Sequence, residues 1–279
     1  MYYRILGSTG LRVSEIGFGT IPILQGNVPV LPDYFDLSED EALAVMEHAY
    51  RLGCNLYDTA IVPEYGDAEI KLGKFAARVG RDRIIISDKA RFFGGSEMYN
   101  AVETSCENLG TTPDIYFVHQ VDAAHEAEVF GRGGALDALM ELKAEGKIRC
   151  AGLATHYYDI LLRGALDDRV DVLQGSGNLL ERGMLDRVRE EAVFRGKGFL
   201  VNKVYAAGLL PARFSEQTLI RFVLSYPISS ALIGLGTKEQ VDVAMGWDAG
   251  VQDTDFPSFE EGLTVLEKEY SPIPCDRCQ

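Results

Sequence analysis

The chain has 279 residues, of which 47% are apolar and 25% are charged, so it is long enough to bury a full globular core. Its formal net charge of −15 argues against nucleic acid and anionic membranes as partners, although it says little about a local site. The sequence contains no apolar run of about 18 residues, so no transmembrane helix is expected. The first ten residues do not resemble a secretory signal peptide. With five cysteines and no secretory context, we expect a cytoplasmic protein.

Short apolar runs alternate with longer helical patterns along the chain. Residues 1–14 predict a hairpin over the bottom of the domain, with Gly10 in its turn. Buried strands are then predicted at residues 15–19, 55–58, 83–87, 115–119, 149–154, 172–174, 199–203 and 231–235. Helices are predicted after the capping box of Ser38 and Glu41, and at residues 68–79, 97–109, 135–145, 160–166, 185–194, 217–225 and 239–249. Residues 22–37 and 120–134 are expected to be loops.

This alternation predicts the α/β class, as a (β/α)8 TIM barrel with an N-terminal β-hairpin; a doubly wound open sheet is the main alternative. A capping box at Ser258 and Glu261 predicts an extra C-terminal helix that reaches about residue 270. We therefore expect one barrel domain over residues 1–270 and a tail over 271–279 that carries Cys275 and Cys278. No GxGxxG follows the first predicted barrel strand, which weakens the open-sheet alternative.

Four polar residues lie at or after the ends of these strands. Asp58, Lys89 and His119 each follow an apolar run, and Tyr65 comes seven residues after Asp58 in a loop. Because parallel strands bring their C-terminal ends to one face, we expect the four side chains to converge there. Taken singly, each has an ordinary interpretation: a helix cap, a surface tyrosine, a solvated lysine or a core histidine. Together they are the groups needed to protonate a carbonyl oxygen.

The chain resembles the aldo-keto reductase family over nearly its whole length. The segment YRILGSTGLRVS at residues 3–14 and GFGT at 17–20 resemble the family's N-terminal pattern. NLYDTA at 55–60 with YGDAE at 65–69 resembles its central signature, and Lys89 and His119 fall where the family's lysine and histidine belong. The resemblance implies a barrel enzyme that reduces an aldehyde or ketone to an alcohol with NADPH, and it carries the catalytic tetrad onto Asp58, Tyr65, Lys89 and His119.

Physical chemistry assigns a role to each member of this tetrad. A phenol has an ordinary pKa near 10, so a nearby ammonium such as Lys89 is expected to lower the pKa of Tyr65 and make it a better acid. Asp58 would keep Lys89 charged and oriented, and His119 would hold the substrate carbonyl beside the phenol. General acid catalysis of this kind contributes about 10²–10⁴-fold.

The resemblance also implies a cofactor site for NADP(H), with NAD(H) possible. Its contacts would come from Thr20, Thr155, His156, Gln174, Lys203, Val204, Tyr205, Gly208, Gly234, Gly236, Thr237, Lys238 and Gln240. Backbone amides at the start of the helix near residue 238 are suited to a phosphate, with Lys238 as a cation. No metal site is expected.

Three positions depart from the family pattern. Gly177 stands where an aromatic residue commonly stacks on the nicotinamide, so the nicotinamide would bind loosely unless Tyr205 or another ring replaces that aromatic residue. Thr155-His156 replaces a serine–asparagine pair, and Ala244 replaces an asparagine that contacts adenine. These departures leave open a reductase-like barrel that binds a ligand with little or no turnover.

The C-terminal CxxC leaves a third alternative open. Cys275 and Cys278 resemble the beginning of a ferredoxin-like extension, and so favour a fragment of an iron–sulfur protein. Two cysteines are fewer than the four ligands that such a cluster usually takes, so no cluster is expected in this chain. The identity of the carbonyl substrate, the choice between NADPH and NADH, and the oligomeric state cannot be read from the sequence.

Overall fold

The computed structural model describes residues 1–26 and 36–247. The predicted helix over 258–270 and the tail with Cys275 and Cys278 lie outside the described residues.

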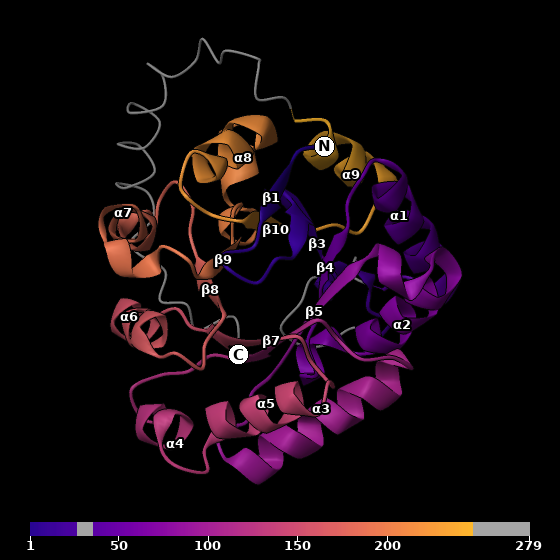
Figure 1. The fold of residues 1–279 in the computed structure, drawn as a ribbon. Helices are drawn as coiled ribbons and strands as arrows, with labels where there is room; N and C mark the ends of the chain where they lie inside the picture. The colour runs from indigo at the N-terminus through magenta and orange to yellow at the C-terminus, as the bar shows by residue number, and fades with distance from the viewer. Residues whose placement is uncertain (27–35, 248–279) are drawn as a thin grey trace.

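Eight parallel strands close into a barrel in the order β10-β3-β4-β5-β6-β7-β8-β9 (Figure 1). They are β3 (Ile16–Gly19), β4 (Leu56–Asp58), β5 (Ile85–Ala90), β6 (Ile115–Val118), β7 (Cys150–Ala154), β8 (Val172–Ser176), β9 (Gly198–Asn202) and β10 (Ser230–Gly234). The ring closes where Ala231 of β10 pairs with Ile16 of β3. The predicted (β/α)8 barrel is confirmed, and the open sheet is excluded.

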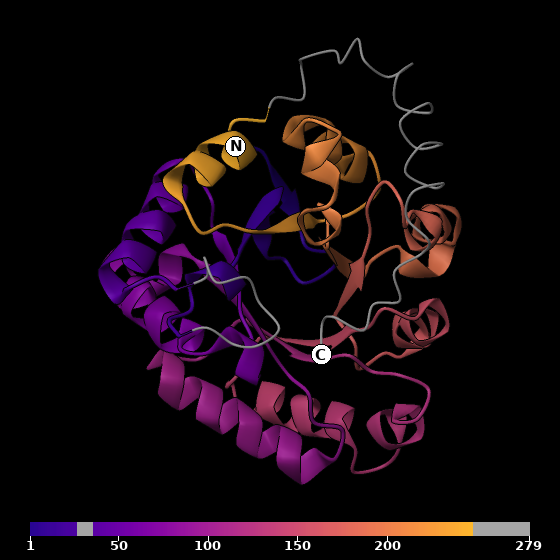
Figure 2. The ribbon, with the colours of Figure 1, turned by 180° about the vertical axis from the view of Figure 1, so that it is seen from behind.

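Helices follow the strands and surround the barrel in both views (Figures 1 and 2). They are α1 (Glu39–Arg51), α2 (Ala68–Val79), α3 (Gly95–Leu109), α4 (Glu126–Phe130), α5 (Ala135–Ala144), α6 (Tyr158–Leu166), α7 (Gly183–Glu190), α8 (Glu216–Leu224) and α9 (Lys238–Met245). Among the described residues, no helix is long and apolar enough to cross a membrane.

Three helical predictions differ from the structure. The loop expected at 120–134 contains the short helix α4. The single helix expected at 185–194 is instead α7 followed by a 3-10 turn, η4 (Ala192–Phe194), because Glu191 adopts an extended conformation while its carboxylate accepts a hydrogen bond from Tyr158. The last described helix ends at Met245 rather than 249, and Gly246 caps it.

The inside of the barrel has an apolar layer near the N-terminal ends of the strands. Inward-facing Leu56, Ile85 and Val172 pack there with Leu6 and Val13 of the N-terminal hairpin. This hairpin consists of β1 (Tyr3–Ile5) and β2 (Arg12–Ser14), paired antiparallel. As predicted, it covers the bottom of the barrel, and the opposite end is left for polar residues.

Gly7 allows the hairpin turn to lie against the barrel. Its φ is +52°, a left-handed conformation, and an added Cβ would lie 2.2 Å from the backbone nitrogen of Gly198. Gly10 in the same turn has a φ of +76°, but its Cβ would meet no atom within 4 Å. At Gly10 only the left-handed backbone disfavours a side chain, whereas at Gly7 the lack of space disfavours it as well.

This difference predicts unequal effects of two matched substitutions. Gly10→Ala should lower the free energy of unfolding by about 1 kcal/mol, because it introduces left-handed strain alone. Gly7→Ala should cost about 3 kcal/mol or more, because it also forces backbone atoms apart. Urea denaturation of both variants measures the difference; equal destabilisation would contradict the close approach of the turn to Gly198.

Candidate active site

Strand alternation brings the predicted acid and ammonium inside the barrel. Asp58 ends β4 and pairs in register with Ser87 of β5. Since successive side chains of a strand face opposite sides, Ser87 and Lys89 both point inward while Asp88 points outward. The sequence run Ser87-Asp88-Lys89 thus supplies two groups to the site and one to the layer between strands and helices.

Lys89 and Asp58 form a buried ion pair. The Lys89 Nζ atom lies 2.5 Å from Oδ2 of Asp58 and also donates to the Thr59 carbonyl at 2.8 Å. The other carboxylate oxygen of Asp58 accepts from the Ser87 hydroxyl at 2.7 Å and from the Gln174 amide at 3.1 Å. Burial alone would lower the pKa of Lys89, but the charges of Asp58 and Tyr65 outweigh it and the pKa is raised. The ammonium is therefore kept charged.

Tyr65 lies in a short 3-10 turn, η2 (Pro63–Tyr65), between β4 and α2. Pro63 begins the turn, and Gly66 ends it with a φ of +52°. The ammonium of Lys89 is 5.4 Å from the centre of the Tyr65 ring. The turn therefore brings the phenol next to the ion pair, although Tyr65 comes from a loop rather than a strand.

His119 directly follows β6 and is 9% exposed. Its backbone N–H donates to the Ala90 carbonyl of β5, which extends the ladder by one residue. Burial lowers the pKa of the imidazole well below its ordinary value, and the charges of Lys89 and Arg91 lower it further. The ring is therefore neutral at physiological pH and can donate one hydrogen bond.

A second pair of acids lies behind Lys89, outside the barrel. Asp88 is completely buried and Glu69 of α2 is 5% exposed. Burial raises the pKa of Asp88 well above its ordinary value, and the adjacent Glu69 raises it further, which favours the protonated form of Asp88. Glu69 in turn accepts from the Asn108 amide at 2.8 Å. In the sequence, Asp88 is the residue that could have indicated this pair, because it is an acid at an outward-facing position of a buried strand.

Several buried polar atoms at the mouth lack partners among the described residues. They include Oγ1 of Thr20, Oε1 of Gln174 and Oδ1 of Asn202, from the C-terminal ends of β3, β8 and β9. Buried polar groups are normally hydrogen-bonded. Unpaired oxygens around one mouth fit a ligand that brings its own donors, such as the carboxamide and ribose of a nicotinamide dinucleotide.

The two residues after β7 differ in their availability. The Thr155 hydroxyl donates to the Val121 carbonyl at 2.6 Å and accepts from the Tyr157 amide at 3.1 Å, so it is engaged within the protein. Nδ1 of His156 is buried and has no partner within the described chain. Of these two predicted cofactor contacts, His156 is the one with a side-chain atom, Nδ1, that is not already hydrogen-bonded within the described residues.

The segment after β9 combines left-handed backbone with buried packing. Lys203 has a φ of +60° without being glycine, and Gly208 has a φ of +88°. Val204 is buried in the outer core, and the Tyr205 hydroxyl lies 3.4 Å from the Glu216 carboxylate of α8. Residues held in such sparsely populated conformations cluster at functional sites, which supports the placement of a ligand loop here.

The start of α9 is already capped by its own side chains. Oε1 of Gln240 accepts from the amides of Gly236 and Thr237 at 2.8 and 3.2 Å, and the Thr237 hydroxyl accepts from the Gln240 amide. A phosphate at these amides would have to displace Gln240. Lys238 is exposed at the first position of this helix. Gly234 ends β10, and a Cβ added there would lie 3.1 Å from the ring of Pro22.

Packing explains two departures from the family pattern. A Cβ on Gly177 would lie 2.7 Å from the Leu185 side chain of α7, so an aromatic residue could enter only if Leu185 moved. Ala244 of α9 is fully buried in the apolar core, which suits a small side chain there.

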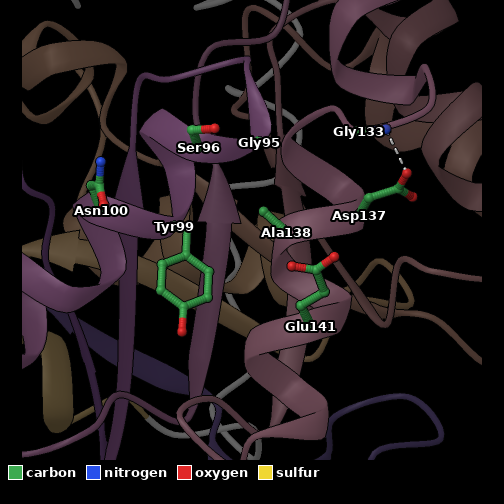
Figure 3. Close-up of a pocket in the computed structure, with 8 residues that line it drawn as sticks. All are labelled: Gly95, Ser96, Tyr99, Asn100, Gly133, Asp137, Ala138 and Glu141. Carbon is green, nitrogen blue, oxygen red and sulfur yellow. Dashed lines mark hydrogen bonds between the residues drawn. The ribbon is translucent and has the colours of Figure 1, made fainter.

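Two surface pockets lie away from this mouth. One of about 390 Å³ lies outside the barrel, between α3 and α5, and Asp137 there accepts from the Gly133 amide at 2.8 Å (Figure 3). The other, of about 550 Å³, lies at the N-terminal end of the barrel beside Gly10 and Arg83. Neither contains a predicted site residue. Within residues 1–26 and 36–247, no group of three or more His, Cys, Asp or Glu side chains is arranged to hold a metal ion.

Comparison with known proteins gives the family. The model of the Aldo/keto reductase family matches residues 15–222, about three quarters of the chain. An aldo-keto reductase from Gibberella moniliformis is 31% identical over 197 residues, which cover 64% of this chain and 56% of that protein. An L-galactose dehydrogenase from Arabidopsis thaliana is 33% identical over 168 residues, which cover 56% of this chain and 49% of that protein. The chain thus spans about half the length of these two curated relatives.

A solved structure agrees over a larger share of the chain. The crystal structure of a provisionally assigned aldo-keto reductase from Pseudomonas aeruginosa superimposes with a TM-score of 0.74 at 28% identity, covering 88% of this chain and 94% of that one. The barrel, the matched family model and these relatives agree, and the chain belongs to the aldo/keto reductase family.

Proposed function

We propose that this protein reduces an aldehyde or ketone to an alcohol, with hydride from NAD(P)H and with Tyr65 as the general acid. The observation that carries the proposal is the position of Lys89, bound to Asp58 at 2.5 Å and 5.4 Å from the centre of the Tyr65 ring. A fixed ammonium stabilises the phenolate that remains after a proton has left the tyrosine. Membership of the family supports carbonyl reduction in general.

The remaining groups position the substrate. Because its pKa is depressed, His119 presents a neutral imidazole whose N–H can donate to the carbonyl oxygen without competing with Tyr65 as the acid. The carbonyl would then lie between an imidazole and a phenol, and the proton of Tyr65 passes to the oxygen as negative charge develops there.

NAD(P)H, when bound, supplies the hydride that adds to the carbonyl carbon. Thr20, Gln174 and Asn202 would hold its nicotinamide end, because each has a buried oxygen without a partner in the described structure. The loop from Lys203 to Gly208 and the start of α9 would hold the phosphates. The single domain over residues 1–270 and the cytoplasmic location remain predictions.

A second candidate function is a reductase-like barrel that binds a ligand but turns over slowly or not at all. The packing of Leu185 against Gly177 favours it, because this packing leaves no stacking ring at that position. Cofactor binding separates the two candidates.

Tyr65→Phe tests the proposed acid. The variant should lower kcat for aldehyde reduction by about 10²–10⁴-fold, because it removes the proton donor, and should leave thermal unfolding unchanged. Tyr99→Phe is a matched control, since the Tyr99 hydroxyl pairs with Glu145 on the outside of the barrel. Turnover of Tyr65→Phe at the wild-type rate would refute the assignment.

The pH dependence tests the state of His119. Because its pKa is lowered, the imidazole should remain neutral as the pH falls through 6.5, and the raised pKa of Lys89 should keep the ammonium charged up to alkaline pH. A plot of kcat/KM for reduction against pH should therefore have no inflection near 6.5. An inflection there that disappears in His119→Asn would show that the histidine titrates normally.

Fluorescence titration with NADPH and NADH tests the cofactor. We expect saturable binding, and we expect Lys238→Met to weaken NADPH binding by about 3- to 10-fold more than NADH binding, because only NADPH carries the additional phosphate. Lys74→Met, which removes an exposed lysine of α2 that pairs with Glu39 of α1, is the control. Absence of binding to either nucleotide would favour the second candidate function.

A further inference from the structure

Arg91 lies at the mouth of the barrel and has no role in the proposed proton transfer. It follows β5 directly, two residues beyond Lys89, and its guanidinium contacts Glu64, the residue before Tyr65 in η2. Its charge also helps to lower the pKa of His119, after burial and Lys89. It is therefore a cation beside the turn that carries the proposed acid.

The guanidinium of Arg91 is only weakly engaged. Its Nη2 atom lies 3.3 and 3.5 Å from the two carboxylate oxygens of Glu64, and its buried Nε has no partner among the described residues. Charge-assisted hydrogen bonds are usually about 2.7–2.9 Å long. Two other arginines of this chain form shorter pairs, Arg81–Asp114 and Arg169–Asp137 both at 2.6 Å, whereas Arg78–Glu47 is also long at 3.2 Å. Arg91 thus retains donors for a further anion.

The surroundings favour a negative ligand group. Besides burial, the charges of Lys89, Arg91 and Lys203 lower the pKa of His119, as positive groups near an imidazole do. Asp58 neutralises Lys89 at close range, whereas the contact of Arg91 with Glu64 is long. In a chain with a net charge of −15, this local positive field is a property of the site and not of the whole surface.

We propose that Arg91 binds a carboxylate on the carbonyl substrate, so that the preferred substrates are aldehydes or ketones that carry an acid group. A single planar guanidinium matches the geometry of a carboxylate, which it can bind through two parallel hydrogen bonds. This inference rests on the proposed function, because it names the substrate class of the same site.

A structural role is the alternative. Glu64 immediately precedes Tyr65, so the Glu64–Arg91 contact could instead hold the η2 turn in place. If so, loss of either partner would slow the reduction of every substrate alike. A role in specificity would change the ratio between acidic and neutral substrates.

The experiment compares kcat/KM for two pairs of aldehydes. One pair is 4-carboxybenzaldehyde and the isosteric 4-nitrobenzaldehyde, and the other is succinic semialdehyde and butanal. For at least one pair, Arg91→Met should reduce the acidic-to-neutral ratio by about 10- to 100-fold relative to wild type. Intrinsic reactivity cancels because the same ratio is compared between variants.

Three further variants sharpen the result. Arg91→Lys keeps the charge without the planar fork, so it should retain an intermediate ratio. Glu64→Gln removes the competing carboxylate and should keep or raise the ratio. Arg83→Met, an exposed arginine before β5 at the opposite end of the barrel, should leave the ratio unchanged.

An unchanged ratio in Arg91→Met for both pairs would overturn the proposal, as would equal losses for acidic and neutral substrates in Arg91→Met and Glu64→Gln. If Arg91→Met does not fold, Arg91→Lys decides: a ratio equal to that of the wild type for both pairs overturns the proposal. Wild-type protein that binds NADPH but reduces none of the four aldehydes would refute the proposed function, and this inference with it. Reduction of the acidic aldehydes without dependence on Arg91 would refute the inference alone.

Discussion

The site depends on a buried ion pair. Lys89 and Asp58 are only 2% and 6% exposed, so both charges have lost most of their hydration. Such a loss is offset only where the geometry is good and the remaining lone pairs are bonded. Here Ser87, Gln174 and the Thr59 carbonyl complete the hydrogen bonds. The pair therefore requires the registry of β4, β5 and β8, and the barrel has to be closed before the ammonium is stable in its place.

The barrel separates the residues that stabilise it from the residues that react. Its lower interior is apolar and closed by the N-terminal hairpin, whereas its upper interior carries the ion pair, His119 and oxygens that have no protein partner. Unpaired buried oxygens cost free energy, so they persist only because the apolar layer and the outer core stabilise the fold independently. A ligand that bonds these oxygens would remove that cost on binding.

Local patterns in the sequence predicted the strands and the hairpin, and they placed Asp58, Lys89 and His119 at or just after strand ends. Strand periodicity and the common end of parallel strands are enough for this, since they depend on neighbours in the chain. The contact of Gln174 with Asp58 was not predictable in the same way, because it joins residues 116 positions apart. The packing of Leu185 on Gly177 and the break at Glu191 are likewise set by contacts between elements that the sequence pattern does not record.

Electrostatics links the proposed chemistry to the proposed substrate class. Burial lowers the pKa of His119 and the cations around it lower it further, so the imidazole stays neutral, which suits a hydrogen-bond donor that should not compete as an acid. The same cations would stabilise negative charge that develops on the carbonyl oxygen. A carboxylate on the substrate would meet this field before any chemistry occurs, and Arg91 is the cation whose existing contact is long enough to exchange. In this proposal the positive groups serve two steps: Arg91 binds the carboxylate of the substrate, and Lys89 assists the proton transfer from Tyr65.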